Sequence, residues 1–240
     1  MYDTELAGIY EALYVDGQGK DYAAEAEGLT TLVRSHLPRA ASLLDVACGT
    51  GAHLAHLRHR FPRVAGVEVS APMREIAVTR LPEVPVYAGD MRTFDLGESF
   101  DAVVCLFSSI GYVDGVHELR QAVARMAAHL TPGGVLVIEP WFTPEQWRDG
   151  HVSHTVAHAD IRMIVRMGHS TRAGQVSHMH NHYLVGEPGV GVRHFRDEHT
   201  MTLFTTPEYE QAVAAAGLAG AEWRSGWSEG RNLLVATRSE

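Results

Sequence analysis

The sequence predicts an α/β fold, in which helices cover both faces of a mostly parallel sheet and an antiparallel β-meander is inserted late in the chain. Three observations support this prediction. From Ser42 onwards, short apolar runs alternate with stretches of helical periodicity, as in strand-helix-strand units. After Glu139, three longer runs with strand character are separated only by short turns. With 240 residues, 45% of them hydrophobic, the chain can bury the core of one such domain, or of one with an appended subdomain.

The elements of the main sheet follow in order from this pattern. A helical N-terminal segment precedes five expected strands at 42–46, 64–69, 84–88, 100–106 and 135–138. Helices are expected between them, near 52–60, 72–80 and 116–129. Ser70 is a candidate N-cap for the second of these helices, with Pro72 in its first turn. The third helix should end before the turn signal of Pro132, Gly133 and Gly134.

The expected meander consists of runs at 162–171, 176–185 and 192–204, which turn-forming segments at 172–174 and 186–189 separate. A helix at 207–216, stopped by Gly217, and two short runs at 221–224 and 233–237 can complete the main sheet. The sequence therefore divides into a main domain, residues 1–140 and 205–240, which begins with a helical lid, and an inserted antiparallel sheet, residues 141–204.

Charge and apolar pattern indicate the kind of partner. A net charge of −9 argues against binding to nucleic acid, which depends on clustered Lys and Arg, so the partner should be a small molecule. Apolar stretches stay shorter than the roughly 18 to 20 residues of a membrane span, and the N-terminus lacks the pattern of a signal peptide. We therefore expect a cytoplasmic protein without membrane contact, in which Cys48 and Cys105 are buried thiols rather than a disulfide.

The first strand-to-helix turn is the predicted ligand site, because small ligands bind beyond the carboxyl ends of parallel strands. Gly49 and Gly51 lie in this turn with Ala47, and the glycines let a ligand approach the backbone N–H groups. Asp45, at the strand end, can orient the loop or meet an amino group of the ligand. A dinucleotide fingerprint would need a third glycine where Leu54 stands, so a pyrophosphate cradle is disfavoured.

Acidic residues at the next two strand ends indicate an adenosine ligand. Glu68 ends the second strand, where a carboxylate can accept hydrogen bonds from both ribose hydroxyls. Asp90 follows the third strand and can accept from an adenine amino group, while Met91 packs against the ring. Alone, each carboxylate could be a solvated strand end. Together, the order DVACGTG, acid and GDM resembles class I methyltransferases, which implies S-adenosylmethionine (SAM) as methyl donor and a Rossmann-like fold.

The chain also resembles a narrower family over nearly its whole length, the N-methyltransferases that dimethylate nucleotide-linked deoxyaminosugars such as those of macrolide antibiotics. The resemblance rests on the blocks GKDY from Gly19, SLLDVACGTG from Ser42, FSSIGY from Phe107, EPWF from Glu139, GVRHF from Gly191, TLF from Thr202, and Gly230-Arg231. It implies that the inserted sheet helps to bind a nucleotide-sugar acceptor, with thymidine diphosphate (dTDP) as the nucleotide, and that the protein is a homodimer.

The resemblance also implies roles for individual residues. Aromatic side chains of the N-terminal segment cover the donor in that family, which makes Tyr2, Tyr10 and Tyr22 candidates. Tyr112 stands where the family places His or Tyr near the transferred methyl group, and Ser109 of the same block is expected to contact the acceptor. Tyr112, or Tyr2, could orient or deprotonate the amine, although the ordinary pKa of tyrosine near 10 makes a tyrosine a weak choice of base.

Basic and aromatic residues are candidates for binding the acceptor. Arg231, and less clearly Arg166, could bind the diphosphate, and Trp141, with or without Phe142, could stack on the base or the sugar. His178, His180 and His182 share one face of a strand, and His151, His154 and His158 have helical spacing, which raises the question of a metal site. Because a sulfonium methyl needs no Lewis acid, we predict no metal. We expect one of His178, His180 and His182, with His180 and His182 favoured, to touch the sugar or phosphate.

Two alternatives stay open from the sequence. The acceptor could be another small amine or hydroxyl compound, or the chain could be a non-catalytic sensor of an adenosyl ligand. In the favoured interpretation, catalysis consists mainly of holding an uncharged amine in line with the methyl–sulfur bond and excluding water.

Overall fold

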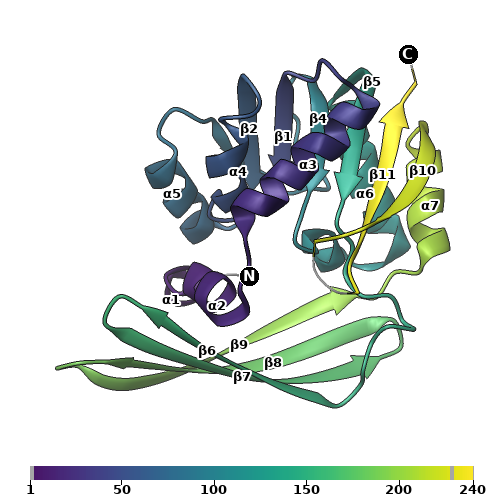
Figure 1. The fold of residues 1–240 in the computed structure, drawn as a ribbon. Coiled ribbons are helices and arrows are strands. Elements are labelled where there is room, and N and C mark those ends of the chain that lie inside the picture. The colour runs from purple at the N-terminus through teal and green to yellow at the C-terminus, as the bar shows by residue number, and fades with distance from the viewer. Residues whose placement is uncertain (1–2, 228–229, 240) are drawn as a thin grey trace.

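Seven strands form the main sheet of the computed structural model, which describes residues 3–227 and 230–239. Their order is β10-β11-β5-β4-β1-β2-β3 (Figure 1). The parallel strands are β1 (Ser42–Val46), β2 (Arg63–Glu68), β3 (Val86–Ala88), β4 (Phe100–Cys105) and β5 (Leu130–Ile138). The antiparallel edge consists of β10 (Leu218–Ser225) and β11 (Asn232–Arg238). The strand order reverses between β1 and β4, which is where open α/β sheets bind ligands.

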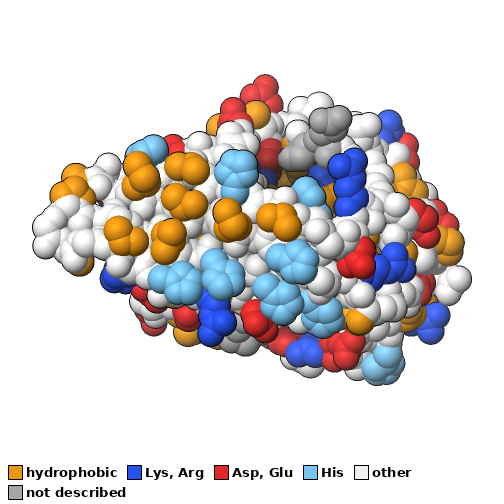
Figure 2. All heavy atoms as spheres, turned by 90° about the horizontal axis from the view of Figure 1, so that it is seen from below, with side chains coloured by type: hydrophobic (Ala, Val, Ile, Leu, Met, Phe, Trp, Pro, Cys, Tyr) orange, Lys and Arg blue, Asp and Glu red, His pale blue; other side chains and the backbone are white. Residues whose placement is uncertain are grey.

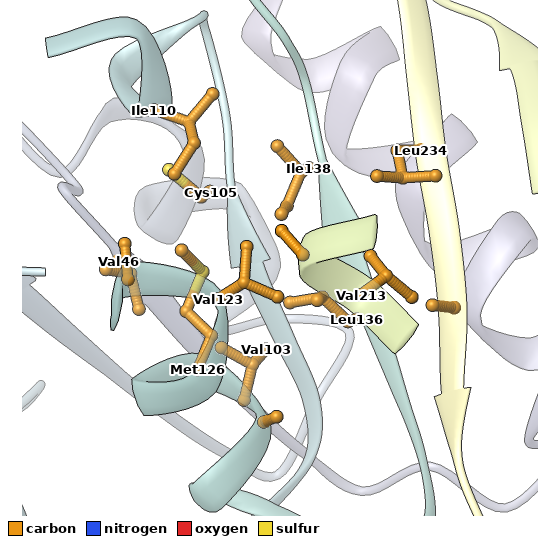
Figure 3. Close-up of a cluster of buried hydrophobic side chains, with 14 of the residues drawn as sticks. Val46, Val103, Cys105, Ile110, Val123, Met126, Leu136, Ile138, Val213 and Leu234 are labelled. Carbon is orange, nitrogen blue, oxygen red and sulfur yellow. The ribbon is translucent and has the colours of Figure 1, made fainter. Parts of the chain in front are cut away.

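Helices cover both faces of this sheet, as the sequence predicts. On one face lie α3 (Tyr22–His36), α4 (Ala52–Leu57) and α5 (Ala71–Arg80), and on the other α6 (Gly115–Ala128) and α7 (Thr206–Ala215) (Figure 1). In the second layer, Val123 and Met126 of α6 and Val213 of α7 pack against strand residues such as Val103 and Leu136 (Figure 3). Because the strands between these two layers run parallel, their carboxyl ends meet at one edge of the sheet.

Local signals in the sequence place most helix boundaries correctly. The side chain of Ser70 accepts a hydrogen bond from Met73 N at 3.4 Å and caps α5, which has proline in its first turn. A difference occurs at β5, which begins at Leu130 rather than at 135. The strand passes through Pro132, Gly133 and Gly134 because a register shift opposite Phe100 and Ala102 absorbs the turn residues.

A second sheet of four antiparallel strands lies between β5 and α7 along the chain (Figure 1). Its strands are β6 (His151–Ala159), β7 (Arg162–Ala173), β8 (Val176–Glu187) and β9 (Gly191–Thr202). The sequence pattern predicted only the last three. The strand that was not predicted is β6, which carries His151, His154 and His158 at a spacing typical of a helix. Its burial instead alternates with a period of two, since Thr155 and Ala157 are buried and Val156 is exposed.

The two N-terminal helices, α1 (Thr4–Ala7) and α2 (Tyr10–Gln18), lie between the two sheets, where the sequence predicts a lid, and they keep that name below (Figure 1). Leu6, Ile9 and Leu13 of the lid pack in one apolar cluster with Ile164 and Tyr183 of the four-stranded sheet. The 3-10 helix η1 (Ser109–Tyr112) follows β4 and contacts β9. These contacts hold the lid and η1 against the inserted sheet.

Two further expectations concern the chain as a whole. In the part of the chain that the structure describes, every helix is too short or too polar to cross a membrane. Cys48 and Cys105 are both free and buried, as the sequence predicts.

Candidate active site

A cavity of about 1090 Å³ lies where the carboxyl ends of the parallel strands face the inserted sheet. Its wall includes residues of the lid, of the segments that follow β1, β2, β3 and β4, and of β6 to β9. The predicted site residues that line this cavity are Tyr10, Ala47, Gly49, Glu68, Asp90, Met91, Ser109, Tyr112, Trp141, Arg166 and Arg231. Asp45, Gly51 and Tyr22 lie behind the wall, and Tyr2 lies outside the described residues. One cavity therefore contains both the predicted donor loop and most of the predicted acceptor side chains.

The loop after β1 is shaped for a ligand. Ala47 and Gly49 have left-handed backbones with φ of 61° and 58°, and open space surrounds the position of a Cβ on Gly49. A left-handed alanine is uncommon and costs conformational energy, which is typical of loops held in shape at functional sites. Gly51, with φ of 73°, begins α4 and packs closely on Leu81 and Ala77. Gly49 therefore serves ligand approach, whereas Gly51 serves the packing of α4 on α5.

Glu68 is bound into this loop. Its Oε2 accepts from Gly49 N at 2.9 Å, and its Oε1 accepts from Ser70 N at 2.7 Å. Burial raises the pKa of Glu68, and these backbone hydrogen bonds act in the opposite direction. Each carboxylate oxygen keeps a second lone pair, so the side chain can still accept from a pair of ribose hydroxyls.

Asp45 lies beneath the loop as a buried carboxyl group, 1% exposed. Its Oδ2 has no hydrogen-bond partner among the described residues. Burial, together with the nearby Glu68, raises the pKa of Asp45 to about 8. A nearby cation would favour the ionised form of this buried carboxyl group, so the residues present fit the ammonium end of SAM.

Asp90 is engaged by a neighbour that the sequence reasoning missed. Arg92 donates to Asp90 Oδ1 through Nε at 2.9 Å and to Oδ2 through Nη2, and it also donates to Glu118 at 2.6 Å. This contact with Arg92 holds the pKa of the Asp90 carboxyl below its ordinary value. Asp90 and Met91 both line the cavity. Asp90 can accept a hydrogen bond from an adenine amino group only through the carboxylate lone pairs that are not already bonded to Arg92.

An aromatic cluster joins the lid to the end of β4. Tyr14 lies with its ring centroid 4.7 Å from that of Tyr10 and 4.8 Å from that of Phe107, and all three rings line the cavity. Phe107 has a left-handed backbone with φ of 51°, and its N–H donates to Glu139 Oε2 at 2.7 Å. Sequence reasoning did not select Tyr14 or Phe107, although Tyr14 lies one helical turn after Tyr10 and Phe107 opens the FSSIGY block.

Tyr22 supports this cluster from behind, rather than lining the cavity as predicted. Its ring packs edge-on against His53, with centroids 4.8 Å apart, and lies beside Lys20. Lys20 Nζ lies 2.7 Å from both carboxylate oxygens of Glu25 and 4.0 Å from the ring centroid of Phe107. The GKDY segment therefore anchors the lid to the β4 end through a buried cation.

Arg231 lies on the acceptor side of the cavity, flanked by aromatic rings. Its guanidinium carbon lies 4.7 Å from the ring centroid of Trp141 and 4.0 Å from that of Phe142, and Nη1 donates to Ser108 Oγ at 3.2 Å. Burial lowers the pKa of Arg231, which still leaves the group charged at neutral pH. Trp141 is fixed by a hydrogen bond from Nε1 to Ser177 Oγ at 3.1 Å. A desolvated, oriented guanidinium of this kind suits a phosphate ligand.

Arg166 reaches the cavity from β7. It donates from Nη2 to Thr155 Oγ1 at 3.1 Å and from Nη1 to Tyr14 Oη at 3.5 Å. Further cavity residues that the sequence reasoning did not select are Gln146, Trp147, Arg148, Met179 and Asn181. All five belong to the inserted sheet or the segment before it, where only the folded structure shows which residues face inward.

Tyr112 presents its hydroxyl group to a histidine from the inserted sheet. Tyr112 Oη lies 2.8 Å from His199 Nδ1, and His199 Nε2 lies 2.5 Å from Asp197 Oδ2. Tyr112 and His199 line the cavity. Sequence reasoning selected Tyr112 alone, because its partner lies 87 positions later in the chain.

His180 and His182 lie on the opposite face of β8 from the cavity, which contradicts their predicted contact with the acceptor. Residues on a strand alternate between faces, and the inward positions here belong to Met179, Asn181 and Tyr183. On the outward face, His182 stacks on His194 with ring centroids 5.3 Å apart. Within residues 3–227 and 230–239, these histidines do not form a group of three or more ligands placed to hold a metal ion.

Comparisons with known proteins extend this geometry to a family. A methyltransferase domain family matches residues 43–134, the segment that contains the donor loop, Glu68 and Asp90. The dTDP-3-amino-3,4,6-trideoxy-alpha-D-glucopyranose N,N-dimethyltransferase of Streptomyces venezuelae is 50% identical over 98% of both chains.

Solved structures agree over the whole fold, including the inserted sheet. The crystal structure of Streptomyces venezuelae DesVI matches with a TM-score of 0.94 and 49% identity, covering 99% of this chain and 100% of that chain. SAM-bound CalS10, an amino pentose methyltransferase from Micromonospora echinaspora, matches with a TM-score of 0.88 and 45% identity, covering 100% and 98%. This chain therefore belongs to the family of SAM-dependent dTDP-aminosugar N,N-dimethyltransferases, with the class I methyltransferase fold.

Proposed function

We propose that this protein transfers two methyl groups in succession from SAM to the amino group of a dTDP-linked deoxyaminosugar, in the biosynthesis of an antibiotic sugar. The observation that supports this function best is that one cavity contains both Glu68 of the donor loop and Arg231 between two aromatic rings. The inserted sheet forms the wall opposite the donor loop, which suits it to hold the acceptor sugar.

The donor half of the cavity would hold SAM through groups already described. Gly49 leaves space for its approach, and Glu68 would accept from the ribose hydroxyls. The charge of Asp45, behind the cavity wall, would favour the ammonium group. The side chain of Tyr10, in the first turn of α2, lines the cavity and would cover the donor. SAM supplies a methyl group that its sulfonium has activated, so the protein has mainly to hold the amine in line and exclude water.

The acceptor half would bind the diphosphate and the base. Arg231 and Arg166 provide fixed cationic donors, and Trp141 and Phe142 offer flat surfaces on which a base or sugar can stack. Ser109 and Tyr112 follow β4, at the strand-order reversal, and would contact the sugar nearest the methyl group. Because the proposed donor and acceptor contacts involve different residues, substitutions should be able to change the SAM affinity and the acceptor affinity separately.

Incubation with SAM and a pair of dTDP-aminosugars tests this function. The acceptors would be a dTDP-3-amino sugar and its 4-amino isomer, and mass spectrometry should show first one and then two added methyl groups on the preferred isomer. A single methyl added to a hydroxyl of a sugar without an amine would instead favour an O-methyltransferase. Tight SAM binding without turnover on any acceptor would favour a sensor.

We also propose that two copies of the chain associate through the outward face of the inserted sheet. Figure 2 shows hydrophobic side chains and histidines gathered on this face. Among them Val152, Val156, Met163, Met167 and Leu184 are between 45% and 61% exposed. Several exposed apolar side chains gathered on one face are unusual on a monomer and suit a symmetric dimer.

Light scattering after gel filtration tests the dimer. The wild-type protein should have twice the chain mass, and M167E should convert it to a monomer that still binds SAM. V78K, at an exposed valine of α5, is the matched control and should leave the mass unchanged. A dimer that survives M167E places the interface elsewhere.

We further propose a cytoplasmic location, which the two free thiols support.

A further inference from the structure

Three side chains from two distant segments lie in series at the acceptor side of the cavity. Tyr112 is the last residue of η1, and its side chain is directed at His199 of β9, with Oη 2.8 Å from Nδ1. Two residues earlier on the same inward face, Asp197 lies 2.5 Å from the other ring nitrogen of His199. His199 is 8% exposed, whereas Tyr112 is 40% exposed and lines the cavity. Only the tyrosine of the three can therefore offer a wide surface to the acceptor.

The carboxylate of Asp197 fixes which nitrogen of His199 carries the proton. An ionised carboxylate at this distance from Nε2 attracts a ring N–H by its charge, so the neutral ring carries its hydrogen on Nε2 and a lone pair on Nδ1. The hydroxyl of Tyr112 therefore donates to Nδ1. Two other tyrosines interact electrostatically with this series. Tyr183 of β8 lies near Asp197 and also interacts with Arg166 of β7. Tyr10 of the lid lies near Tyr112.

We propose, on the basis of the function proposed above, that His199 and Asp197 are positioning residues that make Tyr112 a hydrogen-bond acceptor toward the substrate amine. With its hydrogen donated to His199, the oxygen of Tyr112 can act toward the substrate amine only as an acceptor of a hydrogen bond from an N–H group. The nitrogen lone pair then stays free to point at the methyl carbon. A tyrosine without this pair could donate to the nitrogen lone pair and block the nucleophile.

The same series provides a route for the proton that must leave between the two transfers. In the first transfer the nitrogen lone pair forms the N–C bond, and the C–S bond electrons stay with sulfur. The product is a secondary ammonium, which cannot react again until it loses a proton. That N–H proton passes to Tyr112 Oη as the hydroxyl proton of Tyr112 passes to His199 Nδ1. The imidazolium so formed is stabilised by Asp197, and it loses its proton to solvent before the next cycle.

Four variants separate orientation from proton transfer. Y112F removes the hydroxyl group, and H199A removes its partner. D197N lets an amide donate to Nε2, which moves the ring hydrogen to Nδ1 and turns Tyr112 into a donor toward the amine. H199N places an amide oxygen at the position of Nδ1, so it keeps the tyrosine oriented but cannot take its proton. The measurements are single-turnover rates of the first and the second methylation, followed by mass spectrometry, with the acceptor KM and the SAM Kd.

The expected results differ between the two steps. D197N and Y112F should slow both transfers by about 10-fold or more, whereas H199N should restore the first transfer and leave the second slow by about 10-fold. SAM Kd and thermal unfolding should remain near the wild-type values. H117N and D16N, at exposed positions of α6 and α2, are matched controls and should change neither rate.

Two outcomes would overturn the proposal. In one, H199A and D197N methylate both times at the wild-type rate. In the other, all variants slow both transfers equally, with no recovery in H199N, which indicates a structural role alone. Both outcomes require a wild-type protein that dimethylates the sugar amine, so a failure of the proposed function itself would be seen separately, as a wild-type protein without turnover.

Discussion

The backbone N–H of Gly49 donates to Glu68 Oε2 at 2.9 Å, so the acidic residue that ends β2 is bonded to the loop that follows β1. Two motifs that lie 19 positions apart therefore form one structure before any donor binds. The second oxygen of Glu68 accepts from Ser70 N, the cap of α5. The carboxylate thus organises the donor loop and also faces the cavity.

E68Q should weaken SAM binding by about 10-fold or more. An amide offers one oxygen to two backbone donors, and its NH₂ group must face Gly49 N or Ser70 N, which leaves a buried donor unpaired at a cost of about 1–3 kcal/mol. Isothermal titration with SAM measures the change. E75Q, at an exposed position of α5, is the control and should bind as the wild type does. An unchanged Kd in E68Q would remove Glu68 from the donor site.

SAM binding near pH 7 should release close to one proton from Asp45. In the free protein burial holds the pKa of this carboxyl at about 8, and a donor ammonium beside it favours the ionised form. SAM affinity should then rise with pH between about 5.5 and 7.5. Titration in buffers of different ionisation enthalpy measures the released proton. D45N should bind SAM more weakly, with little pH dependence, and release of the full proton by D45N would refute this assignment.

Asp45 should also make the free energy of unfolding of the SAM-free protein fall as pH rises, whereas SAM affinity rises with pH. Since the pKa of Asp45 is raised from 3.8 to about 8 on folding, its favourable contribution is complete below the unfolded value and is lost as pH rises toward 8. Urea unfolding without SAM at several pH values should therefore show a smaller decline between pH 5 and 8 for D45N than for the wild type. Equal declines would mean that Asp45 is already ionised in the free protein.

R231K should raise the acceptor KM by about 10-fold and leave the SAM Kd unchanged. A lysine keeps the charge but loses the flat guanidinium that packs on Trp141 and Phe142 and can bind a phosphate with two hydrogen bonds. Steady-state kinetics with the dTDP-aminosugar give both constants. R120K, at an exposed arginine of α6, serves as the control. A change in SAM Kd with a constant acceptor KM would place Arg231 in the donor site instead.

G17A should displace the lid, although alanine is ordinarily the better helix former. A Cβ on Gly17 would collide with Cγ2 of Thr155 on β6. We expect a loss of about 1–3 kcal/mol in the free energy of unfolding, with weaker SAM binding. T155S removes the colliding methyl group but keeps the oxygen that accepts from Gln18 and Arg166, so the double variant should recover most of both losses. If G17A alone has wild-type stability, the lid tolerates this displacement.

Local sequence signals predicted the donor half of the site and much less of the acceptor half. Gly49, Glu68 and Asp90 follow consecutive strands of a parallel sheet, whose carboxyl ends must meet, so spacing alone brings them together. The inserted sheet offers no such rule. His180 and His182 differ from Met179 and Asn181 only in the parity of their positions on β8, and a shift of one residue in register exchanges the two sets.

The sequence by itself determined the fold class, the donor loop and the family, because strand-helix periodicity and motif spacing are local properties that a short segment specifies. Only the tertiary structure decided that Arg92 binds Asp90, that Tyr22 lies behind the cavity, and that His199 and Asp197 join Tyr112. These contacts depend on which faces of the lid and of β9 are buried against the rest of the molecule. Burial depends on the packing of the whole chain, which local patterns do not encode.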